Sequence, residues 1–371
     1  MKNILVTGAA GFIGTNLIEH LRRNPEYTVL PFDVNNTEDA LTDLLKAADV
    51  VFHLAGLDGP ASDDEYIAVN TNVTMRIVAR LIEREVKPMI VLASSVQAAA
   101  EHAYGRSKRR AEAALEEYGA IGGGAVIVRL PEVFGKWSRP KYNSLVATMC
   151  ERIVRGDTAP VDDPETVAEL VYIDDVVASF IGLIDTAGEI GVRRIGVHGV
   201  TAITHAALER ELVRLHAIRT AHALPDMSDA FRRALYATLL SFLPENDFTY
   251  GLLKQDDAEG TLAEFIRSPG LGQILVARTR PGHMRCNHYH DTKIEKLCVL
   301  EGDAVVRFRH IANGAVLSYR VSGTDFRIVD VPPGYTHSME NAGERDLVVM
   351  VWASEVDAST APDTYPLAVQ A

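Results

Sequence analysis

The chain begins with the stretch Asn3-Ile4-Leu5-Val6-Thr7-Gly8-Ala9-Ala10-Gly11-Phe12-Ile13-Gly14. A short apolar strand leads directly into a glycine-rich turn, and apolar residues then recur at helical spacing. Glycines at such a turn let the backbone bend tightly and approach a pyrophosphate, which rests on the helix N-terminus. The spacing differs from the usual GxGxxG, so a turn without a ligand is the alternative. The stretch predicts a dinucleotide site formed by Gly8, Gly11, Phe12, Ile13 and Gly14.

Strand-like and helix-like segments alternate through the first half of the chain. Strands are expected at residues 3–6, 27–32, 50–54, 89–93 and 125–130, and helices at 12–21, 39–47, 71–85 and 107–117. This alternation predicts an α/β fold of the Rossmann type, a doubly wound parallel sheet with helices on both faces.

The pattern changes after about residue 245, where short strands separated by turn residues replace the helices. They are expected at residues 273–277, 295–300, 304–310, 317–321, 326–331 and 347–352, which predicts an all-β sandwich or barrel. A helical stretch between residues 205 and 245 joins the halves. The predicted domains are 1–245 and 246–371.

Composition limits the partners and the compartment. A net charge of −13 argues against binding a nucleic-acid backbone or an anionic membrane surface. No signal peptide is recognisable, and no apolar run approaches the roughly 20 residues needed to span a bilayer. The three scattered cysteines do not resemble a disulfide framework, so a cytoplasmic location is expected.

Asp33 ends the second predicted strand, about 20 residues after the glycine-rich turn. A carboxylate there can accept hydrogen bonds from the adenosine ribose and repels a 2′-phosphate. The neighbouring residues Val34-Asn35-Asn36 supply no cation, so Asp33 by itself favours NAD over NADP. The alternative is a capping or solvated aspartate.

Tyr104 and Lys108 are four residues apart, so they lie on one face of a helix. An ammonium group nearby lowers the pKa of a phenol, which lets the tyrosine exchange a proton with a sugar or alcohol oxygen. Ser95, just past a predicted strand, can hydrogen-bond the same oxygen. A Tyr-x-x-x-Lys pair alone also fits a surface helix, and the glycine-rich turn and Ser95 make it specific.

The C-terminal half holds a second pattern, Gly282-His283-Met284-Arg285-Cys286-Asn287-His288-Tyr289-His290-Asp291-Thr292-Lys293-Ile294-Glu295, followed by Gly302. His288 and His290 alternate on a strand, so their side chains share a face. Glu295 follows after a short turn, and His337 can complete the set from another strand. Three imidazoles and a carboxylate suit zinc, iron, manganese or nickel. A surface histidine pair is the alternative.

Residues 1 to about 245 resemble an extended short-chain dehydrogenase/reductase. The run His53-Leu54-Ala55-Gly56 resembles the segment of this family that lines the cofactor, and Asn70 matches its structural asparagine. The run Tyr172-Ile173-Asp174-Asp175-Val176-Val177 matches its substrate-domain signature. The resemblance implies that Leu54, Ala55 and Gly56 contact the cofactor and that catalysis rests on Ser95, Tyr104 and Lys108.

Two departures from this family are informative. Val96 and Gln97 occupy the places where its 4,6-dehydratases carry an Asp-Glu pair, so dehydration is not expected. Glu132 replaces the asparagine that often contacts substrate.

Residues 260–355 resemble a cupin. The first cupin motif is matched from Gly282 to Gly302, and the second is matched in part, without its leading glycine. The resemblance implies a cupin barrel whose ligands are His288, His290, Glu295 and His337.

A reductase followed by a cupin resembles the capsular-polysaccharide enzymes that make UDP-N-acetyl-L-fucosamine precursors. The resemblance implies that the cupin epimerises C3 of a UDP-linked 4-keto-6-deoxy amino sugar. The reductase domain then reduces the C4 ketone to UDP-2-acetamido-2,6-dideoxy-L-talose. NADPH is the implied cofactor, with NADH possible given Asp33. Zinc is the expected metal, and a homodimer follows by analogy of fold.

Two other functions stay open. The chain could be a nucleotide-sugar epimerase that retains NAD and uses the metal-binding domain for dimerisation. It could also be a metal-stabilised binding or assembly module with a degenerate catalytic half, although the intact Tyr104 and Lys108 pair speaks against this.

Overall fold

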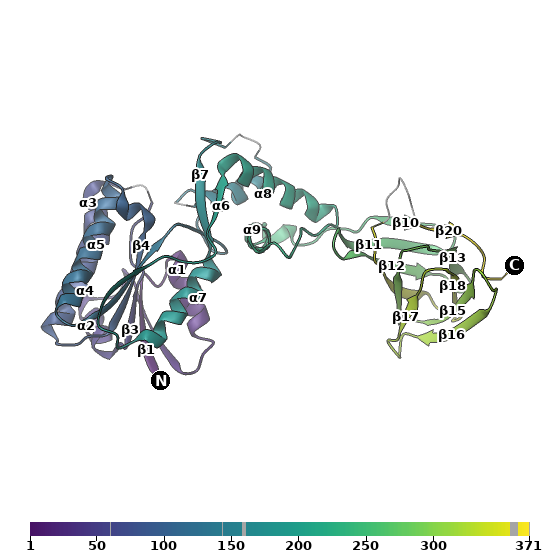
Figure 1. The fold of residues 1–371 in the computed structure, drawn as a ribbon, viewed down its shortest axis with the longest axis horizontal. Helices are drawn as coiled ribbons and strands as arrows, with labels where there is room; N and C mark the ends of the chain where they lie inside the picture. The colour runs from purple at the N-terminus through teal and green to yellow at the C-terminus, as the bar shows by residue number, and fades with distance from the viewer. Residues whose placement is uncertain (60, 143, 158–160, 357–362, 371) are drawn as a thin grey trace. The chain divides into compact units, whose positions relative to one another are not determined.

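The computed structural model describes residues 1–59, 61–142, 144–157, 161–356 and 363–370 (Figure 1). Two compact units make up the chain. The first contains Met1–Val213 and Ala234–Pro244, and the second contains Arg214–Arg233 and Glu245–Ala371.

A six-stranded parallel sheet forms the centre of the first unit. Its strand order is β2-β1-β3-β4-β5-β8. The order reverses direction beside β1, and in open α/β sheets ligands bind at the carboxyl ends of the strands at such a point. The strands are β1 (Lys2–Thr7), β2 (Tyr27–Phe32), β3 (Val50–His53), β4 (Met89–Ser95), β5 (Gly124–Leu130) and β8 (Gly191–Ile195).

Helices cover both faces of this sheet (Figure 1). Successive strand residues point to opposite faces, so Ile4 and Val6 pack with α1 and α7, whereas Leu5 packs with α2, α4 and α5. The predicted doubly wound parallel sheet is therefore confirmed. The helices are α1 (Phe12–Leu21), α2 (Glu38–Ala47), α4 (Asn72–Glu83), α5 (Ala103–Ala120) and α7 (Ile173–Leu183).

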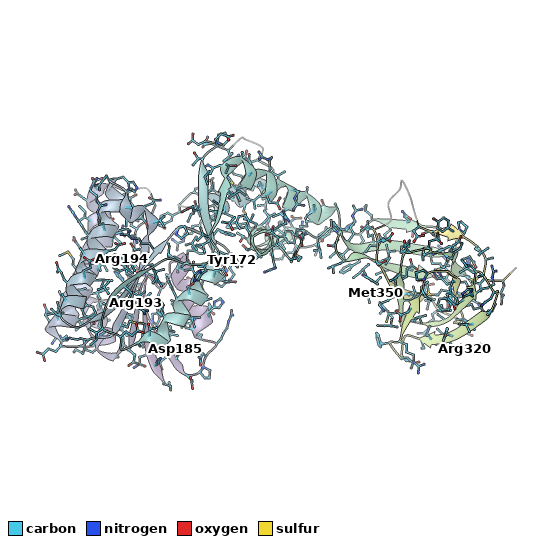
Figure 2. The ribbon with its side chains drawn as sticks, viewed as in Figure 1. Tyr172, Asp185, Arg193, Arg194, Arg320 and Met350 are labelled. Atoms are coloured by element: carbon cyan, nitrogen blue, oxygen red, sulfur yellow. The ribbon has the colours of Figure 1, made fainter. Side chains whose placement is uncertain are left out.

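The edge strand β8 carries Arg193 and Arg194, both labelled in Figure 2. Arg194 pairs with Glu112 and Glu116 of α5 and so ties this edge to the helix layer. The further helices and strands before residue 245 are α3 (Asp63–Tyr66), the π-helical turn η1 (Ile67–Thr71), β6 (Glu132–Phe134), α6 (Leu145–Val154), β7 (Val167–Tyr172), β9 (Thr201–Thr204), α8 (His205–Thr220) and α9 (Ala230–Leu240). The helices α8 and α9 are each divided between the two units.

The second unit is built from antiparallel strands in two sheets, with orders β10-β11-β12-β19-β14-β17 and β16-β15-β18-β13-β20. One apolar core contains side chains of both sheets, among them Leu297, Val349, Phe308 and Met339. The predicted all-β fold is thus confirmed as two facing sheets, and the described strands do not join into one closed barrel. The strands are β10 (Lys254–Asp256), β11 (Gly260–Ser268), β12 (Gly272–Thr279), β13 (Met284–Tyr289), β14 (Glu295–Glu301), β15 (Asp303–His310), β16 (Val316–Ser322), β17 (Ile328–Val331), β18 (Tyr335–Asn341), β19 (Leu347–Ala353) and β20 (Tyr365–Pro366).

Among the described residues, none of the helices combines the length and apolar character needed to cross a bilayer.

Candidate cofactor cleft and metal centre

The glycine-rich turn is packed too tightly for any side chain. Gly8 has a φ of +68°, and a Cβ atom there would lie 2.7 Å from the backbone nitrogen of Ala55. A Cβ at Gly14 would lie 2.2 Å from the carbonyl oxygen of Gly8. Gly11 is the N-cap residue of α1 and has no side chain to accept from the first amides of the helix, which suits the binding of an anion there. This arrangement fits the pyrophosphate of a dinucleotide.

Asp33 directly follows the carboxyl end of β2, and a backbone N–H group of the glycine-rich turn fixes its side chain. Its carboxylate accepts hydrogen bonds from the backbone N–H groups of Ala10, at 2.6 Å, and Val34, at 2.7 Å. The fold also brings Arg76 of α4 into the wall of the cleft that Asn35 and Asn36 line, although the sequence next to Asp33 offers no cation. The Arg76 guanidinium pairs with Glu38 at 3.0 Å.

A single cleft of about 1210 Å³ connects these groups with the predicted catalytic residues. The glycine-rich turn and Asp33 line one part of it, together with the predicted segment Leu54-Ala55-Gly56. Ser95, Tyr104 and Lys108 also line the cleft, so the structure brings the predicted set together.

The helix α5 places Tyr104 in its first turn and Lys108 in the next, because His102 caps the helix through Gly105 N–H. The Lys108 ammonium lies 5.7 Å from the centre of the Tyr104 ring and donates to the carbonyl of Ala93 at 3.1 Å. A Cβ at Gly56 would lie 3.1 Å from this ammonium, so a glycine there leaves room for it.

The expected net lowering of the Tyr104 pKa is wrong for this structure, because the pKa is raised. Burial raises the pKa of the Tyr104 phenol, the Asp58 carboxylate raises it further, and a hydrogen bond with Ser95 lowers it only in part. Burial also lowers the pKa of the Lys108 ammonium, while Asp58 and Glu112 raise it. The phenol is therefore held protonated at neutral pH, which suits a proton donor.

Support for the cleft comes from buried polar groups that the sequence patterns did not single out, apart from Asn70. The Asn70 amide holds Leu57, accepting from its N–H at 2.7 Å and donating to its carbonyl at 2.9 Å, and it donates to Ser107 at 3.0 Å. Glu112 accepts a hydrogen bond from Ser94 at 2.5 Å and pairs with Arg129 at 2.7 Å. Serine, glutamate and arginine residues occur throughout the chain. Only the contacts of these particular residues show that they support the cleft.

The two departures from the reductase family also lie in the cleft wall. Val96 and Gln97 line it directly after Ser95 and offer no acid–base pair. Glu132 accepts a hydrogen bond from the N–H of Leu145 at 2.6 Å, and burial raises the pKa of its carboxyl group. Glu132 therefore caps the start of α6 while facing the cleft.

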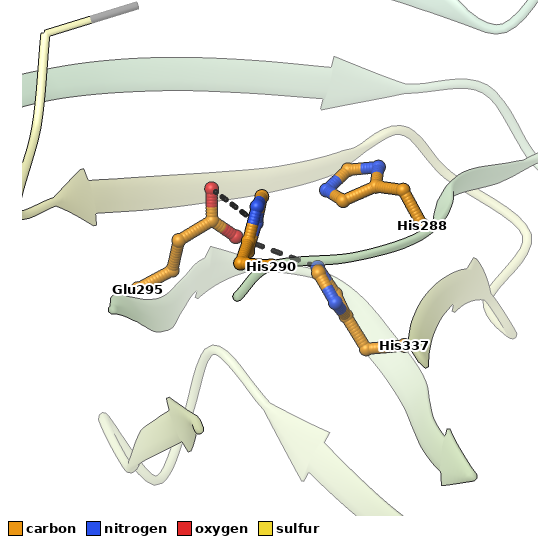
Figure 3. A group of neighbouring side chains, drawn as sticks. All are labelled: His288, His290, Glu295 and His337. Atoms are coloured by element: carbon orange, nitrogen blue, oxygen red, sulfur yellow. Dashed lines mark ion pairs between the residues drawn. The ribbon is translucent and has the colours of Figure 1, made fainter. Parts of the chain in front are cut away.

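In the second unit, His288, His290, Glu295 and His337 converge from separate segments (Figure 3). One ligand atom from each lies within 4.8 Å of all the others. The Glu295 oxygens face His290 Nε2 and His337 Nε2, each at 3.4 Å. These two nitrogens, and His337 Nδ1, are buried and have no hydrogen-bond partner among the residues that the structure describes. Such orphaned donors and acceptors around a carboxylate fit a divalent metal.

The path of β13 differs from the regular strand that the His-x-His spacing predicts. The register with β18 shifts between Cys286 and His288, and Cys286 and Asn287 have positive φ angles. His290 lies just past the end of the strand. A bulge therefore aims His288, and the segment after the strand aims His290, at Glu295 and His337.

Electrostatics favour the ligand forms of these side chains. Burial and the neighbouring His337 lower the pKa of His288 to about 4, which leaves its imidazole neutral at pH 7. Burial raises the pKa of Glu295, but the facing imidazoles of His290 and His337 outweigh it and hold that pKa well below the usual range. A neutral imidazole and an ionised carboxylate are the forms that bind metal.

Two family descriptions match the chain. Residues 4–195 match the NAD dependent epimerase/dehydratase family, and residues 255–365 match the polysaccharide biosynthesis C-terminal domain. The UDP-2-acetamido-2,6-beta-L-arabino-hexul-4-ose reductase of Pseudomonas aeruginosa is 37% identical over 99% of this chain and 98% of its own length.

Solved structures agree in fold. The capsular polysaccharide assembling protein CapF of Staphylococcus aureus is 37% identical and superposes over 99% of both chains with a TM-score of 0.88. The UDP-glucuronic acid 4-epimerase of Bacillus cereus is 20% identical, covers 65% of this chain and 96% of its own, and has a TM-score of 0.55, which shows the fold of that part alone. By its cofactor turn, its parallel sheet and these matches, the chain belongs to the NAD dependent epimerase/dehydratase family.

Proposed function

We propose that the chain is a bifunctional nucleotide-sugar enzyme of capsule or cell-surface polysaccharide synthesis. A cofactor-binding domain, residues 1–245, reduces the C4 ketone of a UDP-linked 4-keto-6-deoxy amino sugar to UDP-2-acetamido-2,6-dideoxy-L-talose. A metal-binding domain, residues 246–371, epimerises C3. The observation that carries the reductase half is the presence of Ser95, Tyr104 and Lys108 in one cleft with the glycine-rich turn. The name of the Pseudomonas relative supports the substrate.

The residues divide the reduction between them. A reduced nicotinamide, if bound in the cleft, would supply the hydride that C4 accepts. Tyr104 donates its phenolic proton to the C4 oxygen, so that the ketone becomes an alcohol. Ser95 orients the carbonyl by a hydrogen bond, and Lys108 holds the nicotinamide ribose while its charge stabilises the phenolate left behind.

NADPH is the proposed reductant, and Arg76 is the cation that supports it, because Arg76 lines the cleft and pairs with Glu38, two residues after Asn36. Asp33 is the feature that supports NADH, since its carboxylate suits a 2′-hydroxyl group and repels a 2′-phosphate. Michaelis constants measured side by side for the two cofactors decide between them. An Arg76→Ala variant that loses affinity for NADPH alone would support NADPH.

The second unit is proposed to be a zinc-binding cupin, supported by its two facing antiparallel sheets and its four converging side chains. His288, His290, Glu295 and His337 would hold the ion. A bound zinc ion supplies Lewis-acid polarisation or structural stiffening. The C4 ketone of the substrate acidifies the C3 hydrogen, so C3 can lose its proton and regain one on the opposite face.

We further propose a cytoplasmic homodimer without nucleic-acid or membrane partners. Free thiols at Cys150, Cys286 and Cys298 support a reducing compartment. Light scattering after size exclusion measures the assembly directly.

The decisive experiment follows absorbance of the reduced nicotinamide with the 4-keto sugar. Tyr104→Phe should slow cofactor consumption by about 10²- to 10⁴-fold, whereas Tyr118→Phe, on the same helix but bonded to the Pro88 carbonyl, should keep the wild-type rate. Deuterium incorporation at C3 in D₂O should persist in Tyr104→Phe and fail in His290→Ala. If neither cofactor is consumed and Tyr104→Phe equals the wild type, the reductase function is wrong. Bound NAD that is unchanged after turnover would instead favour an epimerase that retains its cofactor.

A further inference from the structure

The C-terminal segment of residues 363–369, here named the C-terminal strap, runs beside the four converging side chains. Within it, β20 pairs antiparallel with β13, with Pro366 opposite His288 and Tyr365 opposite Tyr289. The rings of Tyr365 and Tyr289 stack with centres 5.1 Å apart. The strap thus extends the sheet at the strand that carries the first histidine.

Asp363 fastens the strap to the segment that separates His290 from Glu295. Its carboxylate accepts hydrogen bonds from the backbone N–H groups of Asp291, Thr292 and Lys293 at 2.8, 2.7 and 2.7 Å. The Thr292 hydroxyl donates to it at 2.9 Å. Four donors on one carboxylate set the path of these three residues, and that path aims His290 and Glu295 at one point.

The backbone of Asp363 also contacts a ligand directly. Its carbonyl oxygen lies 2.5 Å from His290 Nδ1, so this nitrogen carries the hydrogen and donates it. The other ring nitrogen, Nε2, then presents a lone pair toward Glu295, 3.4 Å away. Second-sphere carbonyls that fix a histidine tautomer in this way are a common support of metal sites.

The far end of the strap is anchored independently of the ligands. The N–H of Leu367 donates to the carbonyl of Asn287, Thr336 donates to the carbonyl of Leu367, and Arg309 donates to the carbonyl of Ala368 at 2.5 Å. Val369 is 2% exposed. The strap is therefore fixed along its length, so its contact with His290 can hold that imidazole in one orientation.

We infer that the C-terminal strap is a positioning element of the metal centre: Asp363 fixes the tautomer and direction of His290 and the spacing of His290 from Glu295. The inference rests on the proposed metal site. Because binding free energies are reciprocal, a metal ion held by His290 must stabilise the strap by the same factor.

The test measures the affinity of the full-length protein for Zn²⁺ by competition with a chromophoric chelator. Asp363→Ala should weaken Zn²⁺ binding by about 10- to 100-fold. Asp363→Asn, which keeps an acceptor oxygen, should recover part of the loss. Asp325→Ala removes a half-exposed carboxylate from the turn between β16 and β17 and should bind Zn²⁺ like the wild type.

Hydrogen exchange provides the second readout. In the wild type, Zn²⁺ should slow exchange of the amides of Asp291, Thr292 and Lys293, and in Asp363→Ala this protection should be lost while the core strands stay protected. If wild type and Asp363→Ala bind Zn²⁺ equally, the strap inference fails and the metal site stands. If the wild type itself binds no Zn²⁺, the metal site fails and the inference with it. If the core strands of Asp363→Ala lose protection, Asp363→Asn takes its place in the test. Wild-type Zn²⁺ affinity and wild-type exchange of the three amides in Asp363→Asn would then refute the inference.

Discussion

Replacing Gly14 with alanine tests whether the glycine-rich turn binds the cofactor by close approach. The new Cβ would lie 2.2 Å from the Gly8 carbonyl oxygen, 3.0 Å from the Gly8 carbonyl carbon and 3.1 Å from the Cα of Ala9. All three contacts are backbone atoms, so no side chain can rotate away. The turn must move by about 1 Å to restore ordinary van der Waals distances, because close-packed interiors leave no slack.

The expected cost follows from that displacement. Overpacking of this kind destabilises a fold by about 1–3 kcal/mol. Displacement of the first amides of α1 removes their contact with the pyrophosphate, so we expect NADPH and NADH to bind more weakly. Quenching of intrinsic fluorescence measures both dissociation constants, and urea titration measures the free energy of unfolding.

Gly182→Ala is the matched control, because it lies in α7 of the same unit and a Cβ there meets nothing within 4 Å. Alanine in a helix interior should stabilise the unit by about 0.5–1 kcal/mol and leave cofactor binding unchanged. If Gly14→Ala binds both cofactors with wild-type affinity, the turn does not approach the cofactor as closely as its packing indicates.

Four further outcomes are expected. Tyr104→Phe should lower kcat by about 10²- to 10⁴-fold with little change in cofactor affinity, measured by steady-state kinetics and fluorescence titration. Asp33→Ser should raise the ratio of kcat/KM for NADPH to that for NADH by about tenfold, because a carboxylate no longer repels the 2′-phosphate. Burial and Lys108 lower the pKa of His53 to about 3, so below pH 6.5 the unfolded chain gains a proton that the folded chain refuses. The unfolding free energy should then fall as the pH falls, by about 2 kcal/mol between pH 6.5 and 4.5 from this group, and the slope of urea-derived stability against pH should be shallower in His53→Gln. Removing metal with a chelator should lower the melting temperature, and Zn²⁺ at 100 times its dissociation constant should restore about 2.7 kcal/mol, measured by calorimetry.

Local sequence determined the architecture of the first unit. The alternation of Ile4, Leu5 and Val6 assigns side chains to opposite faces of β1, and the helical repeat beyond Phe12 supplies one covering layer. Such patterns are readable because each depends only on neighbours a few residues away. The sequence likewise predicted a metal-binding group of three histidines and one glutamate, and the fold does bring these four side chains together.

Only the tertiary structure decided how these groups are tuned. The pKa of Tyr104 rises because burial and Asp58 outweigh Ser95, and Asp58 belongs to a loop far from α5 in sequence. Arg76 reaches the cleft from α4, and Asp363 reaches His290 across 73 positions of the chain. Solvent exclusion, charge and hydrogen bonding act through space, so they depend on segments that meet only after folding. Sequence periodicity specified which elements form, and the packing of distant segments set the chemistry at their ends.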